Sequence, residues 1–161
     1  MKRFLPGLLL TLTLALAAGA RGAEPYKPGD VFEPFTTKDQ HEQSYTFTPG
    51  VRTVIVSFAM GSGKDANQYL EKQPANFLAS HQAVFIANIH GMPGIGRMFA
   101  LPKMKKYPHR ILLADDEHFL DRYPSRKDHL TVFTLDPQGR IDSINFIDPA
   151  RAMPSIFAAK R

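Results

Sequence analysis

Short apolar runs separated by turn-forming residues dominate the chain from about residue 45 onward, and they predict a β-sheet. The runs are 53–58, 83–89, 110–114, 130–135 and 140–147, with a shorter one around 45–47. Their β-branched and nearly continuous apolar character is typical of strands that are buried in a sheet. Asp136-Pro137-Gln138-Gly139 separates the last two runs, and its residue types are those that a type I turn prefers. These two runs therefore predict a hairpin.

Apolar residues at three- and four-residue spacing predict helices between the strands. The longest helical stretch follows Gly61-Ser62-Gly63 and extends to about Ser80, with Ser62 and Asp65 as a capping box at its start. Pro74 is expected to kink or divide this stretch. Further helices are expected over 98–106, over 119–123 and from about residue 150. The alternation predicts a three-layer α/β fold, with a central mixed sheet, helices on both faces and a C-terminal hairpin.

The first 22 residues follow a different pattern, which is typical of a secretory signal peptide. Lys2 and Arg3 precede an apolar run over 4–18, and small residues follow it. The run is shorter than the ~20 residues that a membrane span needs. We therefore expect a signal peptide over 1–22, cleaved near residues 20–23, and a single domain over 23–161. The mature protein is expected in the periplasm, and it would contact a membrane only before cleavage.

Charge and cysteine content exclude several classes of function. The chain has 20 basic and 15 acidic residues, but some of the basic ones belong to the leader. The mature domain is therefore nearly balanced, which argues against nucleic acid as a partner. The sequence contains no cysteine. Thiol redox catalysis and thiolate metal sites are thereby excluded.

The glycine-rich turn before the first helix is not a phosphate-binding P-loop. Phe58 stands where that motif needs its first glycine, and Asp65 follows Lys64 where the motif needs Ser or Thr. The turn is better explained as the start of a helix, whose N-terminus could hold a small anion.

Metal and hydrolase sites also lack the required spacing. The six histidines include no pair at the i, i+4 spacing of a zinc helix. His90 with Met92 and Met98 is compatible with copper, but lone histidines and core methionines explain the same residues. Since there is also no Gly-x-Ser-x-Gly elbow, we assign no catalytic residue, no metal and no cofactor.

Several segments stand in the order of a known fold. They are Pro28-Gly29-Asp30 with Phe32, the strand 54–58, the stretch 112–123 and the hairpin 133–141. Together they resemble the thioredoxin fold in its peroxiredoxin-like and TlpA-like branch. Asn88 with 92–96, Met98-Phe99 and Lys105-Lys106-Tyr107-Pro108 resemble the YtfJ-like periplasmic proteins more closely. The resemblance covers nearly all of the mature chain and implies a thioredoxin-like fold.

The departures from this family concern its redox chemistry. The two cysteines of the redox members match positions near Gly63 and Ala66, and the family's cis-proline matches Leu130 or its neighbour. A non-proline cis bond costs about 3–4 kcal/mol, so we expect an ordinary trans peptide there. The resemblance thus implies the fold without thiol–disulfide exchange.

We therefore expect a non-catalytic binding or adaptor protein for a peptide, a protein partner or a small anion. In thioredoxin folds, partners meet the strand-to-helix turn and the loop before the hairpin strand. The expected binding residues are Met60, Gly61, Ser62, Gly63, Lys64, His129 and Leu130. The loop 90–96 could adjoin this surface. Met60 and Leu130 would be the apolar flanks of this surface. The alternative is a periplasmic enzyme that uses non-thiol groups or a borrowed cofactor or metal.

The leader generates a first testable prediction. Intact-mass measurement of the periplasmic protein should show a chain that begins between Arg21 and Glu24, because signal peptidase cuts after small residues at the end of the apolar run. Full-length protein in the cytoplasm, or a precursor retained in the membrane, would contradict it.

Overall fold

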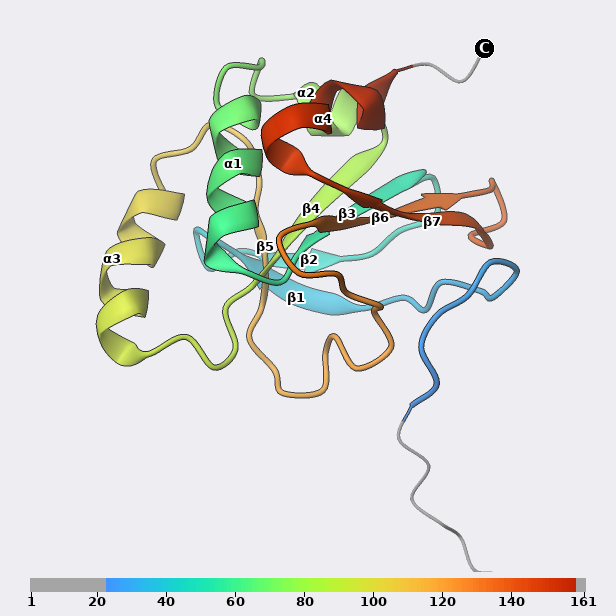
Figure 1. The fold of residues 1–161 in the computed structure, drawn as a ribbon, viewed down its shortest axis with the longest axis horizontal. Coiled ribbons are helices and arrows are strands. Elements are labelled where there is room, and N and C mark those ends of the chain that lie inside the picture. Colours follow the sequence, from blue (N-terminus) through green and yellow to red (C-terminus); the bar gives the residue numbers. More distant parts are fainter. Residues whose placement is uncertain (1–22, 159–161) are drawn as a thin grey trace, which may run out of the picture.

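A mixed sheet of seven strands organises residues 23–158, which are the part of the chain that this computed structural model describes (Figure 1). The predicted signal peptide lies outside these residues. The strands are β1 (Thr36–Asp39), β2 (Ser44–Thr46), β3 (Thr53–Ser57), β4 (Ala83–Asn88), β5 (Leu112–Ala114), β6 (Leu130–Leu135) and β7 (Ile141–Ile147), in the order β2-β1-β5-β4-β3-β6-β7. β3, β4 and β5 are parallel, and the other neighbours are antiparallel. The predicted α/β class, with a mixed sheet and a C-terminal hairpin, is confirmed.

The helices of the described region are α1 (Met60–Leu70), α2 (Phe77–Ser80), α3 (Gly94–Met104) and α4 (Pro149–Phe157). The predicted division near Pro74 is confirmed, since α1 ends and α2 begins on either side of it. α3 starts at Gly94 rather than at residue 98, and it tolerates Pro102 in its last turn. None of the helices within residues 23–158 has both the length and the apolar character of a membrane span.

The predicted helix over 119–123 is wrong, because this segment forms a series of turns. The Asp116 carboxylate accepts the amide of His118 at 2.8 Å, as in an Asx-turn. Single i to i+3 backbone bonds then follow, such as the bond from the Tyr123 amide to the Leu120 carbonyl.

The described helices pack on one face of the sheet. From β3 to β4 to β5 the chain steps in the same direction across the sheet, and right-handed connections then place α1 and α3 on the same side. The core on this face contains buried residues of α1, α2 and α4, with Met104 of α3 packed against it.

Irregular segments cover the opposite face, where a second layer of helix was expected. The core there is aromatic and draws on the N-terminal segment, the 115–124 loop and the sheet: Tyr26, Phe32, Phe47, Tyr123 and Phe133. The Tyr26 and Phe32 rings stack with centroids 5.3 Å apart, and the Tyr123 ring meets both edge-on. Large aromatic rings therefore bury this side of the sheet without a helix.

The N-terminal segment is also hydrogen-bonded to the β6–β7 hairpin. The amide of Gly29 donates to the carbonyl of Ile141 at 2.8 Å, and the amide of Phe32 donates to Gly139 at 2.9 Å. The hairpin turn matches its prediction: Gly139 has φ +80°, and the Asp136 carboxylate accepts the amide of Arg140. These bonds fix the extended segment across the end of the hairpin.

Buried polar groups join the β1–β2 hairpin to β5. Burial raises the pKa of Asp39, but hydrogen bonds from Arg110 and from the amides of His41 and Gln43 outweigh it, so the pKa of Asp39 lies below its usual value. Gln40 bridges the carbonyl of His109 and the amide of Ile111 at 2.7 and 2.8 Å. These hydrogen bonds therefore fix the loop before β5 to the β1–β2 hairpin.

Candidate functional site

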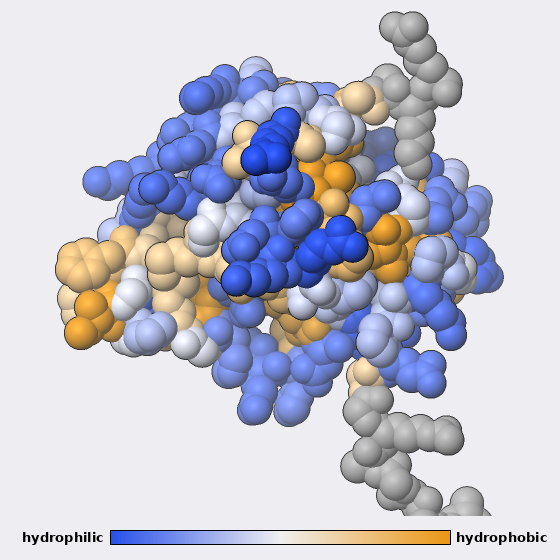
Figure 2. All heavy atoms as spheres, in the orientation of Figure 1, coloured by the Kyte–Doolittle hydropathy of each residue, from blue (hydrophilic) through white to orange (hydrophobic). Residues whose placement is uncertain are grey.

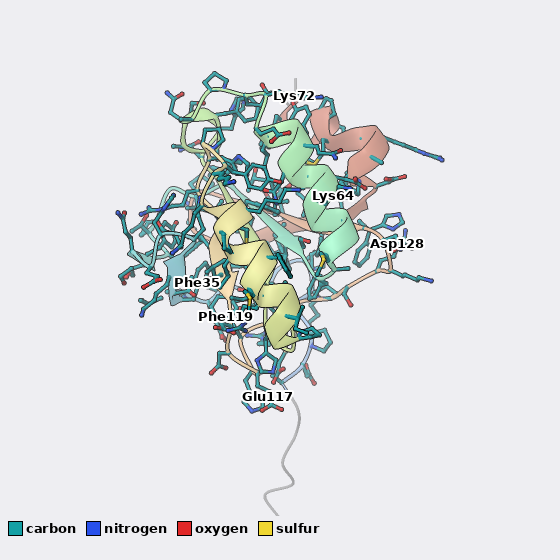
Figure 3. The ribbon with its side chains drawn as sticks, turned by 90° about the vertical axis from the view of Figure 1, so that its left-hand side faces the viewer. Phe35, Lys64, Lys72, Glu117, Phe119 and Asp128 are labelled. Carbon is teal, nitrogen blue, oxygen red and sulfur yellow. The ribbon has the colours of Figure 1, made fainter. Side chains whose placement is uncertain are left out.

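An open, mostly apolar groove lies between α1 and α3, with a cavity volume of about 290 Å³. Figure 3 shows the two helices side by side, with Lys64 on α1. The groove is lined by residues of both helices, of the ends of β3 and β4 and of two loops: Ser57, Ala59, Met60, Gly63, Lys64, Asn67, Ala87, Asn88, Met92, Gly96, Phe99, Ala100, Lys103, Met104 and Tyr107. The carboxyl ends of parallel strands are the usual place for a ligand in an α/β sheet.

A close approach between helix and strand forms the α1 wall of the groove. A Cβ atom on Gly63 would lie 2.9 Å from the Ser57 hydroxyl, a distance that real Cβ contacts do not reach. α1 therefore passes directly over the end of β3 because Gly63 has no side chain. The buried Ser62 hydroxyl donates to the carbonyl of Ala59 at 3.1 Å, which tightens the same turn.

The opposite wall is α3, an 11-residue helix that has apolar residues on all sides and buries none of them. Three of its apolar side chains, Ile95, Met98 and Phe99, are 74%, 68% and 72% exposed. Figure 2 shows apolar side chains gathered at the edge of the molecule where Figure 1 places α3. A helix that is apolar all round normally has a partner on each side. An exposed apolar surface of this kind is typical of an interaction site.

One arginine anchors α3 to the sheet. The Arg97 guanidinium donates to the Asp115 carboxylate at 2.9 Å and to the carbonyl of Ile89 at 3.0 Å. A guanidinium that holds a carboxylate and a carbonyl together fixes the geometry of its helix. The groove thus has a defined width although α3 buries little surface.

The charge of the groove is positive. Among the described residues that line it, Lys64 and Lys103 carry the charges. Both are exposed, so they can meet a carboxylate at the edge of the groove without being desolvated. In residues 23–158 no three His, Asp or Glu side chains come together as metal ligands.

A buried histidine supports the groove from behind. His109 is 1% exposed, and its Nε2–H donates to the side-chain oxygen of Asn67 at 2.8 Å. Tyr107 covers it, with the two rings stacked at 5.3 Å. Burial lowers the pKa of His109 to about 4, so the imidazole is neutral at pH 7. Its Nδ1 has no hydrogen-bond partner among the described residues.

Three of the residues expected from the sequence line the groove: Met60, Gly63 and Lys64. Gly61 lies on α1 outside the groove, with open space around its α-carbon. The predicted capping box is wrong, because α1 begins at Met60 and its N-cap Ala59 makes no side-chain hydrogen bond. Ser62 lies inside the helix and is buried, so it is not available to a ligand.

The loop before β6 contributes less than expected. Leu130 is fully buried in the core and pairs with Ser57 in the sheet, so the prediction that it flanks a binding surface is wrong. His129 is half-buried, and its ring bonds the carbonyl of Lys127 at 2.7 Å. Neither residue lines the groove. The peptide bonds of the described residues are all trans, as expected at Leu130.

Most of the α3 side of the groove was not expected from the sequence. Met92 and Gly96 belong to the stretch 90–96, which was expected only to adjoin the binding surface. The residues missed are Phe99, Ala100, Lys103, Met104 and Tyr107. A signal was present, since 94–104 has apolar residues on opposite sides of the helix rather than along one stripe.

No protein-family model matches the sequence, and no curated protein has a matching sequence. Solved structures do share the architecture. The thioredoxin domain of a thiol-disulfide oxidoreductase from Bacteroides vulgatus has a TM-score of 0.54 and 17% identity, covering 82% of this chain and 99% of that one. A candidate thiol:disulfide interchange protein DsbE from Chlorobium tepidum has a TM-score of 0.56 and 13% identity, covering 81% and 94%. Peroxidoxin BcpB from Mycobacterium tuberculosis has a TM-score of 0.52 and 13% identity, covering 82% and 94%.

The fold is thioredoxin-like. The fold implied by the resemblance in the sequence is thereby confirmed. The resemblance in the sequence matches the two redox cysteines to positions near Gly63 and Ala66. A Cβ atom on Gly63 would overlap the Ser57 hydroxyl, and Ala66 is fully buried.

His109 makes the stability of the domain depend on pH. The unfolded chain binds a proton below about pH 6.5, whereas the folded protein binds it only near pH 4. The free energy of unfolding should therefore fall by about 3 kcal/mol between pH 6.5 and pH 4. Urea denaturation of His109→Gln should show a flatter pH dependence in this window, while the exposed control His41→Gln keeps the wild-type slope. Equal slopes in all three proteins would contradict the assignment.

Because Gly63 contacts Ser57, alanine substitution at two glycines of α1 should change the free energy of unfolding in opposite directions. Gly63→Ala should lower the free energy of unfolding by about 1–2 kcal/mol, because the new methyl group overlaps the Ser57 hydroxyl. Gly61→Ala should raise it by about 0.5–1 kcal/mol, because alanine is the better helix former and meets open space.

A second background tests the cause of this difference. In a Ser57→Ala protein, Gly63→Ala should no longer destabilise, since the overlapping oxygen is gone. Urea denaturation of the four combinations measures the coupling. Stabilisation by Gly63→Ala in the wild-type background would rule out the close approach.

Proposed function

We propose that this chain is an exported, redox-inactive binding or adaptor protein of the YtfJ-like kind. Its ligand is an acidic, apolar peptide segment of a protein partner, held in the groove between α1 and α3. The observation that carries this proposal is the groove itself, which is open, mostly apolar and bordered by lysines.

The shape and lining of the groove favour a peptide over a small anion. Methionine and phenylalanine side chains from both walls offer an adaptable apolar surface, as in proteins that bind varied sequences: Met60, Met92, Phe99 and Met104. A small anion bound alone would leave this apolar surface exposed to water. A segment that alternates leucine with aspartate satisfies both the apolar wall and the lysine edge.

The chemistry of the site supports binding rather than turnover. The hydroxyls of Ser57 and Tyr107 have no histidine or carboxylate among the described lining residues to activate them. The Ser57 hydroxyl donates instead to the carbonyl of Ala59 at 3.0 Å. His109 is buried behind Asn67, and its lowered pKa keeps it neutral. The resemblance of the leader to a signal peptide supports export, and the periplasm would then be the place where the partner is met.

A groove-filling variant tests the proposal. The Cβ of a residue at position 96 would lie 3.4 Å from Met92 and 3.9 Å from Met60, so Gly96→Leu projects its side chain into the groove. The probe is a fluorescein-labelled peptide, Gly-Ser-Leu-Asp-Leu-Asp-Ser-Gly, and fluorescence anisotropy measures its Kd. Gly96→Leu should weaken binding at least tenfold, or about 1.4 kcal/mol.

Matched controls separate the groove from the rest of the surface. Gly61→Leu makes the same change on α1 outside the groove, and it should bind the probe like the wild type. Probe versions with serine for leucine, or lysine for aspartate, should bind more weakly than the original. Equal binding by the wild type and Gly96→Leu, or indifference to the probe sequence, would refute a peptide site in this groove.

A further inference from the structure

The methionines of the described region are concentrated at the candidate site. Met60, Met92 and Met104 line the groove, and Met98 lies beside it on the outer face of α3. The remaining one, Met153, is 1% exposed in the core under α4. Core packing does not explain this distribution, because Met60 and Met98 are 63% and 68% exposed.

Peroxide can reach the methionines at the open groove, where Met60 is 63% exposed and Met92 is half-buried. A thioether reacts with a hydroperoxide when its sulfur lone pair attacks the outer oxygen and the O–O bond breaks. The sulfur loses two electrons and becomes a sulfoxide. The other peroxide oxygen leaves after proton transfer, as water from hydrogen peroxide or as an alcohol from an organic hydroperoxide. The reaction needs access to the sulfur, and sulfoxide reductases reverse it. The chain has no cysteine to consume the oxidant first.

Oxidation at these positions changes the property on which the groove depends. Met60 and Met92 approach each other on either side of Gly96, since the Cε of Met60 and the Cγ of Met92 both lie within 4 Å of the same Cβ position. A sulfoxide there places a strongly polar oxygen on an apolar wall. An apolar side chain of a ligand would then displace water from the sulfoxide without offering a hydrogen bond.

We infer that Met60 and Met92 form a reversible oxidation site, at which hydroperoxides switch the groove from an apolar, binding state to a polar, non-binding state. The site thereby gives a thiol-free thioredoxin-like domain a response to oxidants. The switching part of this inference rests on the proposed peptide binding, whereas the location of the oxidation site does not.

The location is tested first, by peptide mapping after limited treatment with hydrogen peroxide. Met60 and Met92 should gain one oxygen each while Met153 stays reduced, and methionine sulfoxide reductase should remove these oxygens. Oxidation of Met98 with Met60 and Met92 still reduced would overturn the inference, whatever the protein binds.

The switch is tested with the acidic leucine probe and two variants. Oxidation of the wild type should weaken probe binding at least tenfold, and the reductase should restore it. A Met60→Leu, Met92→Leu, Met104→Leu variant keeps the groove apolar and should bind equally before and after peroxide. Met98→Leu, which changes only the outer face, should still lose binding on oxidation.

The outcomes distinguish the two proposals. If the untreated wild type does not bind the probe, the proposed function fails, and the mapping result alone decides whether the oxidation site exists. If the wild type binds equally before and after Met60 and Met92 are oxidised, the switch is refuted while peptide binding stands. Equal loss of binding in the triple leucine variant would also refute the switch.

Discussion

The passage of α1 across the end of β3 is the constraint on which the site depends. At Gly63 the helix lies so close to Ser57 that a methyl group does not fit, and Ser62 is drawn into the same contact. This closeness leaves the neighbouring face of α1, with Met60 and Lys64, open toward α3. The contact lies near one of the positions to which the resemblance matches a redox cysteine. The same close packing therefore shapes one wall of the groove that is proposed as the binding surface.

Much of the fold follows from the sequence because its strands have strong local signals. β3, β4, β6 and β7 are β-branched or apolar runs, and the turn before β7 has the residue types that its backbone requires. The elements that were missed lack such signals. β1 is four residues long and polar, and it is a strand because it pairs with β2 and β5. The 119–123 segment has apolar residues at helical spacing, but tertiary packing of Phe119 and Tyr123 onto the aromatic core overrides this spacing.

The candidate site was predictable only in part, for a related reason. The strand-to-helix turn is local in sequence, and three of the residues predicted from it, Met60, Gly63 and Lys64, line the groove. The other wall comes from a helix some 30 residues further along the chain. A local sequence pattern does not indicate which two helices will lie side by side and form a groove. Leu130 illustrates the opposite error, since its position beside the turn is right but its side chain points into the core. Strand alternation decides that direction, and a one-residue change in register would reverse it.

The attachment of the N-terminal segment to the hairpin has a consequence for biosynthesis. Gly29 and Arg140 meet although 111 positions separate them along the chain. Synthesis proceeds from the N-terminus, so Tyr26 and Phe32 leave the ribosome long before the strands that cover them exist. Contacts at this separation must wait for a large loop to close, which slows folding relative to a chain with local contacts. The nascent chain therefore exposes the aromatic side chains of this segment until residue 141 has emerged. During that interval it is prone to aggregation and accessible to chaperones.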